Sequence, residues 1–305
     1  MKDLLNKVIC GDCLEVMKEI PDKSVDLVLT DPPYYKAINE KWDKQWKTEK
    51  KYLEWCKLWF NDCARVLKDT GSFYCYGNFD ILSKQKTFIF DKQLQFRQNI
   101  TLNKGLKSIA GRTSDKLRMF PTASEYLLFY TKQDMWFKTP FSIVMEEKMK
   151  EQELTQFDIS KLELSKSGNI TGWVHNKLKG KQLPTKEQWE KICKLFNIKN
   201  DYKKLLEEHK KQRFTFNLPM ATTDIWDFSI DKIRYGHPTQ KPQDICKKII
   251  NASSNKNDLV LVPFVGSGSE LVACKELGRN FIGIEISPEY CKIAEDRLKQ
   301  EVLLT

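Results

Sequence analysis

The sequence lacks any long apolar run. In its 305 residues the longest nearly uninterrupted apolar stretch is LVLVPFV at 259–265, whereas a membrane-spanning helix needs about 20 apolar residues. The N-terminal segment MKDLLNKVICGDC also lacks the long apolar centre and small-residue cleavage site of a signal peptide. We therefore expect a soluble, intracellular protein of the cytoplasm that has no membrane partner.

Cysteine and histidine occur, but not in the patterns of disulfides or metal sites. The nine cysteines are an odd number and are scattered, unlike a secreted disulfide framework. Cys10 and Cys13 form a C-x-x-C, yet no second pair with ligand spacing follows, and His175, His209 and His237 show no ligand spacing either. We expect reduced thiols that pack in the core, and no bound metal.

Positive charge is in excess, and it is distributed unevenly. The net charge is +10, but the last seventy residues contain nine basic and nine acidic residues. Residues 84–118 contain nine Lys and Arg against two Asp. Such a local excess suits the phosphate backbone of a nucleic acid, although a solvated Lys-rich surface would give the same pattern.

Apolar patterns predict a doubly wound α/β fold with a mostly parallel, Rossmann-like sheet, because strands alternate with helices. In the helix expected at 48–68, Trp55, Leu58, Trp59 and Cys63 fall on one face. The expected strands are 6–11, 25–30, 72–77, 123–131, 258–264 and 280–286. The other expected helices are 12–20, 243–253, 269–277 and 288–301.

The middle of the chain has a different character. Residues 145–213 are polar, helical in pattern and poor in β-branched runs, as expected of an inserted helical region. We therefore divide the chain into one half of an α/β domain at 1–135, a recognition region at 136–235 with its insertion at about 150–213, and the other half at 236–305.

A glycine-containing turn follows one expected strand in VLVPFVGSGSE, residues 260–270. Gly266 and Gly268 would let the backbone approach a ligand at the carboxyl end of the strand, although a tight turn explains G-x-G alone about as well. The next strand ends in Glu285, at the spacing at which an acid can hold the two hydroxyls of a ribose. Together these residues predict a site for a nucleoside cofactor.

A second motif, TDPPYYKA at 30–37, ends a core strand. Its prolines remove amide donors, so that the Asp31 carboxylate and the Pro32 carbonyl become two acceptors facing one small volume. Such a pair suits an exocyclic amino group, which offers two N–H bonds, and Tyr34 adds a ring on which a base can stack. A simple proline turn that caps the strand is the alternative.

These motifs resemble those of the amino-type DNA methyltransferases that use S-adenosylmethionine. D-P-P-Y at 31–34 is similar to their catalytic motif, F-V-G-S-G at 264–268 to their cofactor loop, and GHPTQKP at 236–242 also resembles the family. The order of the motifs is that of the family's β group. The resemblance implies the methyltransferase fold, and D-P-P-Y favours methylation of adenine N6 over cytosine N4.

The resemblance also implies roles for individual residues. Asp31, Pro32, Pro33 and Tyr34 would form the catalytic site, and Glu285 would hold the ribose. The expected cofactor-binding residues are Asp12, Cys13, Asp31, Thr239, Lys241, Phe264, Gly266, Ser267, Gly268 and Glu285. Within this set, Asp12 would meet the adenine amino group, and Thr239 and Lys241 would approach the methionine carboxylate.

One position departs from the family pattern. Val262 stands where the family usually has Asp before Pro-Phe, so a carboxylate expected near the ammonium group of the cofactor is missing. We expect weaker cofactor binding or compensation by another carboxylate, such as Asp31. Val262→Asp would then tighten cofactor binding.

The segment 154–198 resembles a helix-turn-helix of the phage-repressor type, in which a second helix enters the major groove. Asn, Thr and Lys side chains read base edges there; a helical insertion that only packs on the core is the alternative. The expected DNA-binding residues are Lys104, Lys107, Arg112, Lys116, Arg118, Asn169, Thr171, Trp173, His175, Asn176 and Lys177.

The function expected from the sequence is site-specific transfer of a methyl group from S-adenosylmethionine to a flipped adenine in double-stranded DNA. The expected setting is a restriction-modification system or a phage or orphan enzyme, with a cognate restriction endonuclease as a partner and a monomeric or homodimeric state. The alternatives are methylation of cytosine N4, methylation of RNA or of a non-DNA amide, and a DNA-binding regulator with a relic methyltransferase fold.

Overall fold

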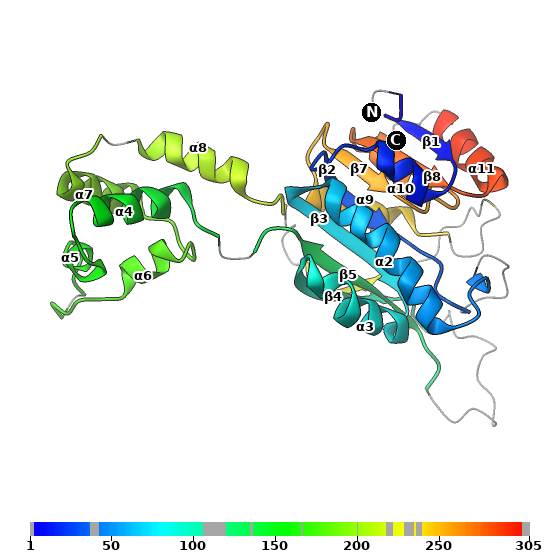
Figure 1. Ribbon diagram of the computed structural model, residues 1–305, viewed down its shortest axis with the longest axis horizontal. Coiled ribbons are helices and arrows are strands. Elements are labelled where there is room, and N and C mark those ends of the chain that lie inside the picture. Colours follow the sequence, from blue (N-terminus) through cyan, green and yellow to red (C-terminus); the bar gives the residue numbers. More distant parts are fainter. Residues whose placement is uncertain are drawn as a thin grey trace. The chain divides into compact units, whose positions relative to one another are not determined.

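The computed structural model divides the chain into two compact units (Figure 1). The first comprises Met1–Lys132 and Phe214–Thr305, and the second is Gln133–Arg213. Residues 214–217 and 222–228, which the sequence analysis assigned to the recognition region, therefore belong to the first unit. The structure describes residues 3–36, 43–105, 120–134, 137–165, 167–199, 201–217, 222–228, 235 and 240–300.

The first unit is built on an eight-stranded sheet with the strand order β1-β8-β7-β2-β3-β5-β4-β6. β5 runs antiparallel to its neighbours β3 and β4, and the other pairs are parallel. The strands are β1 (Lys7–Cys10), β2 (Val25–Thr30), β3 (Leu67–Gly77), β4 (Gln95–Asn103), β5 (Ser124–Thr131), β6 (Ile225–Asp227), β7 (Leu259–Val262) and β8 (Asn280–Glu285). The mostly parallel α/β sheet is as expected, whereas β4 and β6 were not predicted.

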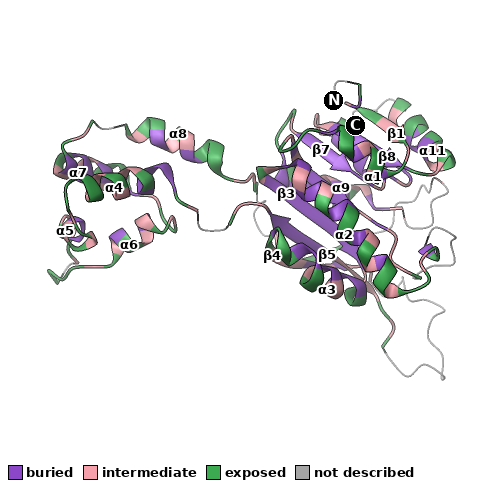
Figure 2. Ribbon diagram, in the orientation of Figure 1, coloured by how far each residue is buried: buried purple, intermediate pink, exposed green. Residues whose placement is uncertain are grey.

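Helices cover both faces of this sheet and enclose two apolar cores. Side chains of α1, α2 and α3 belong to one core, and side chains of α9, α10 and α11 belong to the other. Figure 2 shows the buried strands between helices whose outer sides are exposed. The helices are α1 (Cys13–Val16), α2 (Glu49–Val66), α3 (Phe79–Phe88), α9 (Gln243–Ser253), α10 (Ser269–Glu276) and α11 (Pro288–Lys299), with short 3-10 turns at Met17–Glu19 and Phe90–Lys92.

The predicted apolar face of α2 needs one correction. Trp59 and Cys63 are fully buried as expected, but the side chain of Leu58 is 53% exposed. Tyr52 and Cys56 complete the buried face instead, because Tyr52, Cys56, Trp59 and Cys63 follow one another at intervals of three or four residues and share one side of the helix.

The second unit has its own core, formed by five helices in its described residues. Trp189 and Phe141 lie at the centre of this core, with ring centroids 5.0 Å apart. Capping boxes at Thr155 and Thr185 fix the starts of α5 and α7. The helices are α4 (Pro140–Glu151), α5 (Gln156–Ser160), α6 (Trp173–Leu178), α7 (Lys186–Phe196) and α8 (Tyr202–Gln212).

The parallel strands bring four predicted site segments to one edge of the sheet. Asp12 follows β1, Glu285 ends β8, Gly266 follows β7 and Asp31 follows β2. Ligands of open α/β sheets bind outside the carboxyl ends of the strands, so this edge is where a site is expected. Among the described residues, no helix has the length and apolar character required to cross a membrane.

Candidate active site

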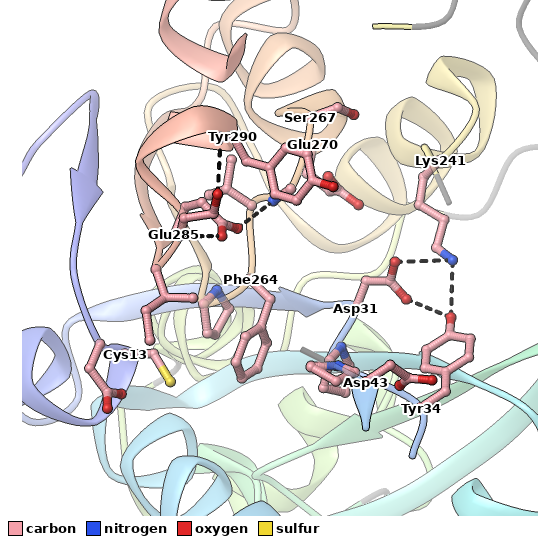
Figure 3. Close-up of a pocket in the computed structure, with 18 of the residues that line it drawn as sticks. Cys13, Asp31, Tyr34, Asp43, Lys241, Phe264, Ser267, Glu270, Glu285 and Tyr290 are labelled. Carbon is pink, nitrogen blue, oxygen red and sulfur yellow. Dashed lines mark hydrogen bonds and ion pairs between the residues drawn. The ribbon is translucent and has the colours of Figure 1, made fainter. Parts of the chain in front are cut away.

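A cavity lies at this edge of the sheet, with residues from both ends of the chain around it (Figure 3). Most of the predicted catalytic and cofactor-binding residues meet here, although they are far apart in the sequence. Those that line the cavity are Asp12, Cys13, Asp31, Pro32, Pro33, Tyr34, Lys241, Phe264, Gly266, Ser267 and Glu285.

Asp31 is the centre of a buried network of charges. Its Oδ1 accepts a hydrogen bond from the Tyr34 hydroxyl at 2.5 Å, and its Oδ2 lies 3.1 Å from Lys241 Nζ. Lys241 also donates to the Tyr34 hydroxyl at 3.0 Å and pairs with Glu125 at 3.4 Å. Lys104 pairs with Glu125 on its other side. The network therefore contains two carboxylates and two ammonium groups.

Burial and charge act against each other in this network. Burial raises the pKa of Asp31, while Lys241 and the Tyr34 hydroxyl oppose that rise. Burial likewise disfavours the charged form of Glu125, but Lys241 and Lys104 outweigh it and lower the pKa of Glu125 to about 2. Although burial opposes its charge, the pKa of Lys241 is raised by Asp31 and Glu125. Lys241 thus favours the carboxylate form of Asp31.

The backbone after Asp31 is held in an unusual conformation. Tyr35 and Lys36 have φ values of 62° and 60°, a left-handed region that costs a non-glycine residue about 1–2 kcal/mol. The Tyr52 hydroxyl donates to the Pro33 carbonyl at 2.6 Å, and the Tyr52 ring lies 5.3 Å from that of Tyr35. Helix α2 thus holds the D-P-P-Y segment at Pro33 and packs against Tyr35, the first of the two strained residues that follow it.

Glu285 lies at the other side of the cavity and is 8% exposed. Its Oε2 accepts from the Gly266 amide at 2.8 Å, and its Oε1 accepts from the Ser287 amide at 2.9 Å. Burial raises the pKa of Glu285, and these two amides oppose that rise. Each carboxylate oxygen keeps a further lone pair for a ligand hydroxyl.

The two glycines of the G-x-G turn have different roles. Gly266 lines the cavity with φ at 51°, whereas Gly268, with φ at 82°, is not among the cavity residues. A Cβ atom on Gly268 would lie 2.9 Å from the Cβ atom of Ala294, so this glycine allows α11 to pack closely. Ser267 accepts hydrogen bonds from Arg297 through its carbonyl and hydroxyl oxygens at 2.6 and 3.1 Å.

Apolar side chains form the floor of the cavity. The Phe264 ring packs 5.6 Å from the rings of Trp55 and Trp59. Cys13 is buried, and burial raises the pKa of its thiol. A neutral thiol is a poor nucleophile, so Cys13 contributes to packing at the edge of the cavity.

Val262 does not occupy the place that the sequence analysis expected. Its side chain is 1% exposed and packs in the core cluster beneath the sheet, and it is not among the cavity residues. A carboxylate at this position would be buried among apolar side chains. We therefore no longer expect Val262→Asp to tighten cofactor binding.

The predicted DNA-binding residues that the structure describes differ in exposure, and Lys104 is half-buried in its ion pair with Glu125. Asn169 and His175 are exposed, and Asn169 and Thr171 precede α6 instead of lying within it. Lys177 is buried and donates to Gln182, and the Trp173 indole is half-buried against the core of the second unit. Asn176 is half-buried. The predicted residues outside the described part of the chain are Lys107, Arg112, Lys116, Arg118 and the cofactor residue Thr239.

Sequence reasoning missed several cavity residues. Glu270 had a visible signal, because it is an acid in the first turn of the helix that follows G-S-G. Of the others, Gln240, Pro263 and Val265 lie within motifs quoted in the sequence analysis, and the rest come from segments that only the fold brings to the cavity. The missed residues other than Glu270 are Gly11, Asp43, Gln45, Trp55, Gln240, Pro263, Val265, Ile286, Ser287 and Tyr290.

The fold and the cavity define a methyltransferase-type α/β protein with a nucleoside site beside an Asp-Pro-Pro-Tyr loop. A model of the DNA methylase family, N6_N4_Mtase, matches residues 25–296. The chain belongs to this DNA methylase family.

Individual relatives agree with this assignment. The chain is 28% identical to the Type II methyltransferase M.HinfI of Haemophilus influenzae, over 98% of this chain and 70% of the relative. It is 27% identical to the DNA adenine methyltransferase YhdJ of Escherichia coli, over 95% of this chain and 82% of the relative. A solved complex of M1.HpyAVI with SAM is similar in fold, with a TM-score of 0.55 and 21% identity over 96% of this chain and 99% of the other.

Three expectations from the sequence are thereby confirmed: the amino-type DNA methyltransferase family, the fold class and the enzyme class. S-Adenosylmethionine is the cofactor of this family, as expected. DNA is the substrate class.

Proposed function

We propose that this enzyme methylates the N6 amino group of an adenine that is flipped out of duplex DNA, at a specific sequence. The observation that carries this proposal is the position of Asp31, whose carboxylate faces the same cavity as Glu285 and the G-S-G turn. An amino-group acceptor and a nucleoside site thus share one cavity (Figure 3).

The cavity residues fit S-adenosylmethionine. Glu285 offers carboxylate lone pairs for ribose hydroxyls, and Phe264 and Ile286 offer apolar contact for a base. Ile286 is 67% exposed although it directly follows the buried strand β8, which an apolar ligand surface would explain. When bound, S-adenosylmethionine supplies an electrophilic methyl group.

Asp31 and the Pro32 carbonyl would act on the amino group of the target base. That nitrogen is a poor nucleophile because its lone pair is conjugated with the ring. Hydrogen bonds from its two N–H groups to the Asp31 carboxylate and the Pro32 carbonyl would localise the lone pair on nitrogen. Both oxygens of Asp31 keep a lone pair for this purpose, because Tyr34 and Lys241 each use only one.

Tyr34 and Lys241 would orient Asp31. The Tyr34 hydroxyl and the Lys241 ammonium hold opposite oxygens of its carboxylate, which fixes the plane of the group. This position differs from the expectation that Lys241 approaches the methionine carboxylate, because its ammonium is already shared by Asp31 and Glu125. We propose that Lys241 keeps Asp31 ionised.

The second unit would read the DNA sequence. Helices α5 and α6 follow each other in the order of a helix-turn-helix, although residues 161–172 make their connection longer than the usual three- or four-residue turn. We propose that residues at the start of α6 enter the major groove. Asn169 and His175 are exposed and able to reach base edges. We propose these two residues, but not the buried Lys177, as base-reading side chains.

The test is to digest DNA methylated by the purified enzyme and to identify the modified nucleoside by mass spectrometry. N6-methyl-2′-deoxyadenosine supports the proposal, and N4-methyl-2′-deoxycytidine would replace it with the alternative base. Sequencing the modified positions reports the recognition sequence in the same experiment. We further propose that a restriction endonuclease of the same specificity is a partner, which the similarity to Type II methyltransferases supports. We also propose that the enzyme is a monomer or a homodimer.

A further inference from the structure

Glu270 is a cavity carboxylate to which the catalytic scheme gives no role. It lies in the first turn of α10, two residues after Gly268, and its side chain is 4% exposed. Glu270 lines the cavity together with Ser267 and Tyr290 (Figure 3). In the part of the chain that the structure describes, no lysine or arginine forms an ion pair with it.

Two other carboxylates of the cavity already have partners. Glu285 accepts hydrogen bonds from two backbone amides, and Asp31 is held by Lys241 and Tyr34. A buried carboxylate without a cation is unfavourable unless a ligand supplies one. Glu270 is therefore a buried cavity carboxylate whose charge calls for a cationic group of the ligand.

We propose that Glu270 binds the α-ammonium group of the methionine part of S-adenosylmethionine. This inference rests on the proposed function of the cavity. An ammonium group provides three N–H donors, whereas the sulfonium provides none, so hydrogen bonding selects the ammonium.

The ionisation of Glu270 agrees with this role. Burial raises the pKa of Glu270 to about 7, the charge of Asp31 adds to the rise, and Lys241 and Arg297 oppose it. An ammonium group binds the carboxylate form, so cofactor affinity should fall as the pH drops below about 7, where an α-amino group stays protonated. The charged and titratable groups that face Glu270 are Asp31, Tyr76, Lys241, Cys246, Cys274 and Arg297.

The test measures, by calorimetry and without DNA, the dissociation constants of three ligands for the wild type and for Glu270→Gln. S-Adenosylmethionine and S-adenosylhomocysteine both carry the ammonium group, and 5′-methylthioadenosine carries neither the ammonium nor the carboxylate. We expect Glu270→Gln to weaken binding of the first two by roughly ten- to a hundredfold and to leave 5′-methylthioadenosine unchanged. Glu276→Gln is the matched control, because Glu276 lies on the same helix and pairs with Lys247 outside the cavity.

Several outcomes would overturn the proposal. Equal binding by Glu270→Gln and the wild type would do so, as would an equal loss for all three ligands or a loss for S-adenosylmethionine alone. If the wild type bound none of the ligands, the cofactor assignment itself would fail. Should Glu270→Gln not fold, the wild type decides: affinity for S-adenosylhomocysteine must fall between pH 8 and pH 6 while that for 5′-methylthioadenosine stays constant, and a constant affinity for both refutes the role.

Discussion

At the scale of single residues, the site depends on charges that are buried together. Burial and the charge of Glu125 raise the pKa of Asp31, whereas Lys241 and the Tyr34 hydroxyl lower it. Removing one member of such a network leaves the others without compensation. Substitutions in the network should therefore change the ionisation of Asp31 as well as remove contacts.

Replacing Asp31 itself should stop methyl transfer. In Asp31→Ala the acceptor for the target amino group is lost, and we expect the turnover rate to fall by about 10²–10⁴-fold. DNA binding should stay largely intact, because Asp31 forms no part of the proposed base-reading helix. Single-turnover transfer of a tritiated methyl group and gel-shift titration measure the two quantities. Asp69→Ala, an exposed partner of Lys23, is the control, and retained turnover in Asp31→Ala contradicts the assignment.

Replacing Lys241 should move the pH dependence of turnover. Lys241 lowers the pKa of Asp31, so Lys241→Met raises that pKa and leaves less carboxylate at neutral pH. We expect turnover to drop at pH 7 and to recover as the pH rises, with the acidic limb of the pH–rate profile shifted to higher pH. Lys247→Met on α9 should leave the profile unchanged, because its partner is Glu276. A change confined to the KM for the cofactor would instead support the original expectation of a cofactor-binding lysine.

At the scale of elements, the strands and helices predicted from the sequence are those that apolar periodicity or a local motif reveals. β2, β7 and β8 were predicted because each is a short apolar run next to a turn, and a site motif comes directly after each strand or at its end. β4 was missed because its sequence, QFRQNITLN, is mostly polar and half-exposed near the sheet edge. The contact between Lys241 and Asp31 was missed for a different reason: it joins segments 210 residues apart, and no local pattern reports it.

The turn between β7 and α10 should be sensitive at Gly268. Gly268→Ala places a Cβ atom 2.9 Å from that of Ala294 in a left-handed conformation, and we expect a loss of about 2–4 kcal/mol in the free energy of unfolding. Gly278→Ala is a matched control with φ at 69° and only the flexible Lys256 side chain at 3.4 Å, so it should lose about 1–2 kcal/mol. Denaturant unfolding measures both, and equal losses would mean that close packing against α11 does not require Gly268.

At the scale of the whole molecule, the chain consists of two units with separate cores. The first contains the cavity, and the chain folds its two ends into one sheet in which β1 pairs with β8. The second is an inserted helical unit with its own buried Trp189. Separate cores make it possible to change the surface of one unit without altering the other, so the proposed functions of the two units can be tested independently.

The double variant Asn169→Ala with His175→Ala should separate sequence reading from methyl-donor binding. Each lost base contact is expected to weaken binding to the recognition sequence by about 1–3 kcal/mol, while affinity for unrelated DNA and its salt dependence stay the same, because no phosphate contact is removed. The dissociation constant for S-adenosylmethionine should not change. Glu187→Gln, on the exposed side of α7, is the control in the same unit. Fluorescence anisotropy with specific and unrelated duplexes measures the ratio of the two DNA affinities. If this ratio did not change in the double variant, the second unit would be an insertion that packs without reading the DNA sequence.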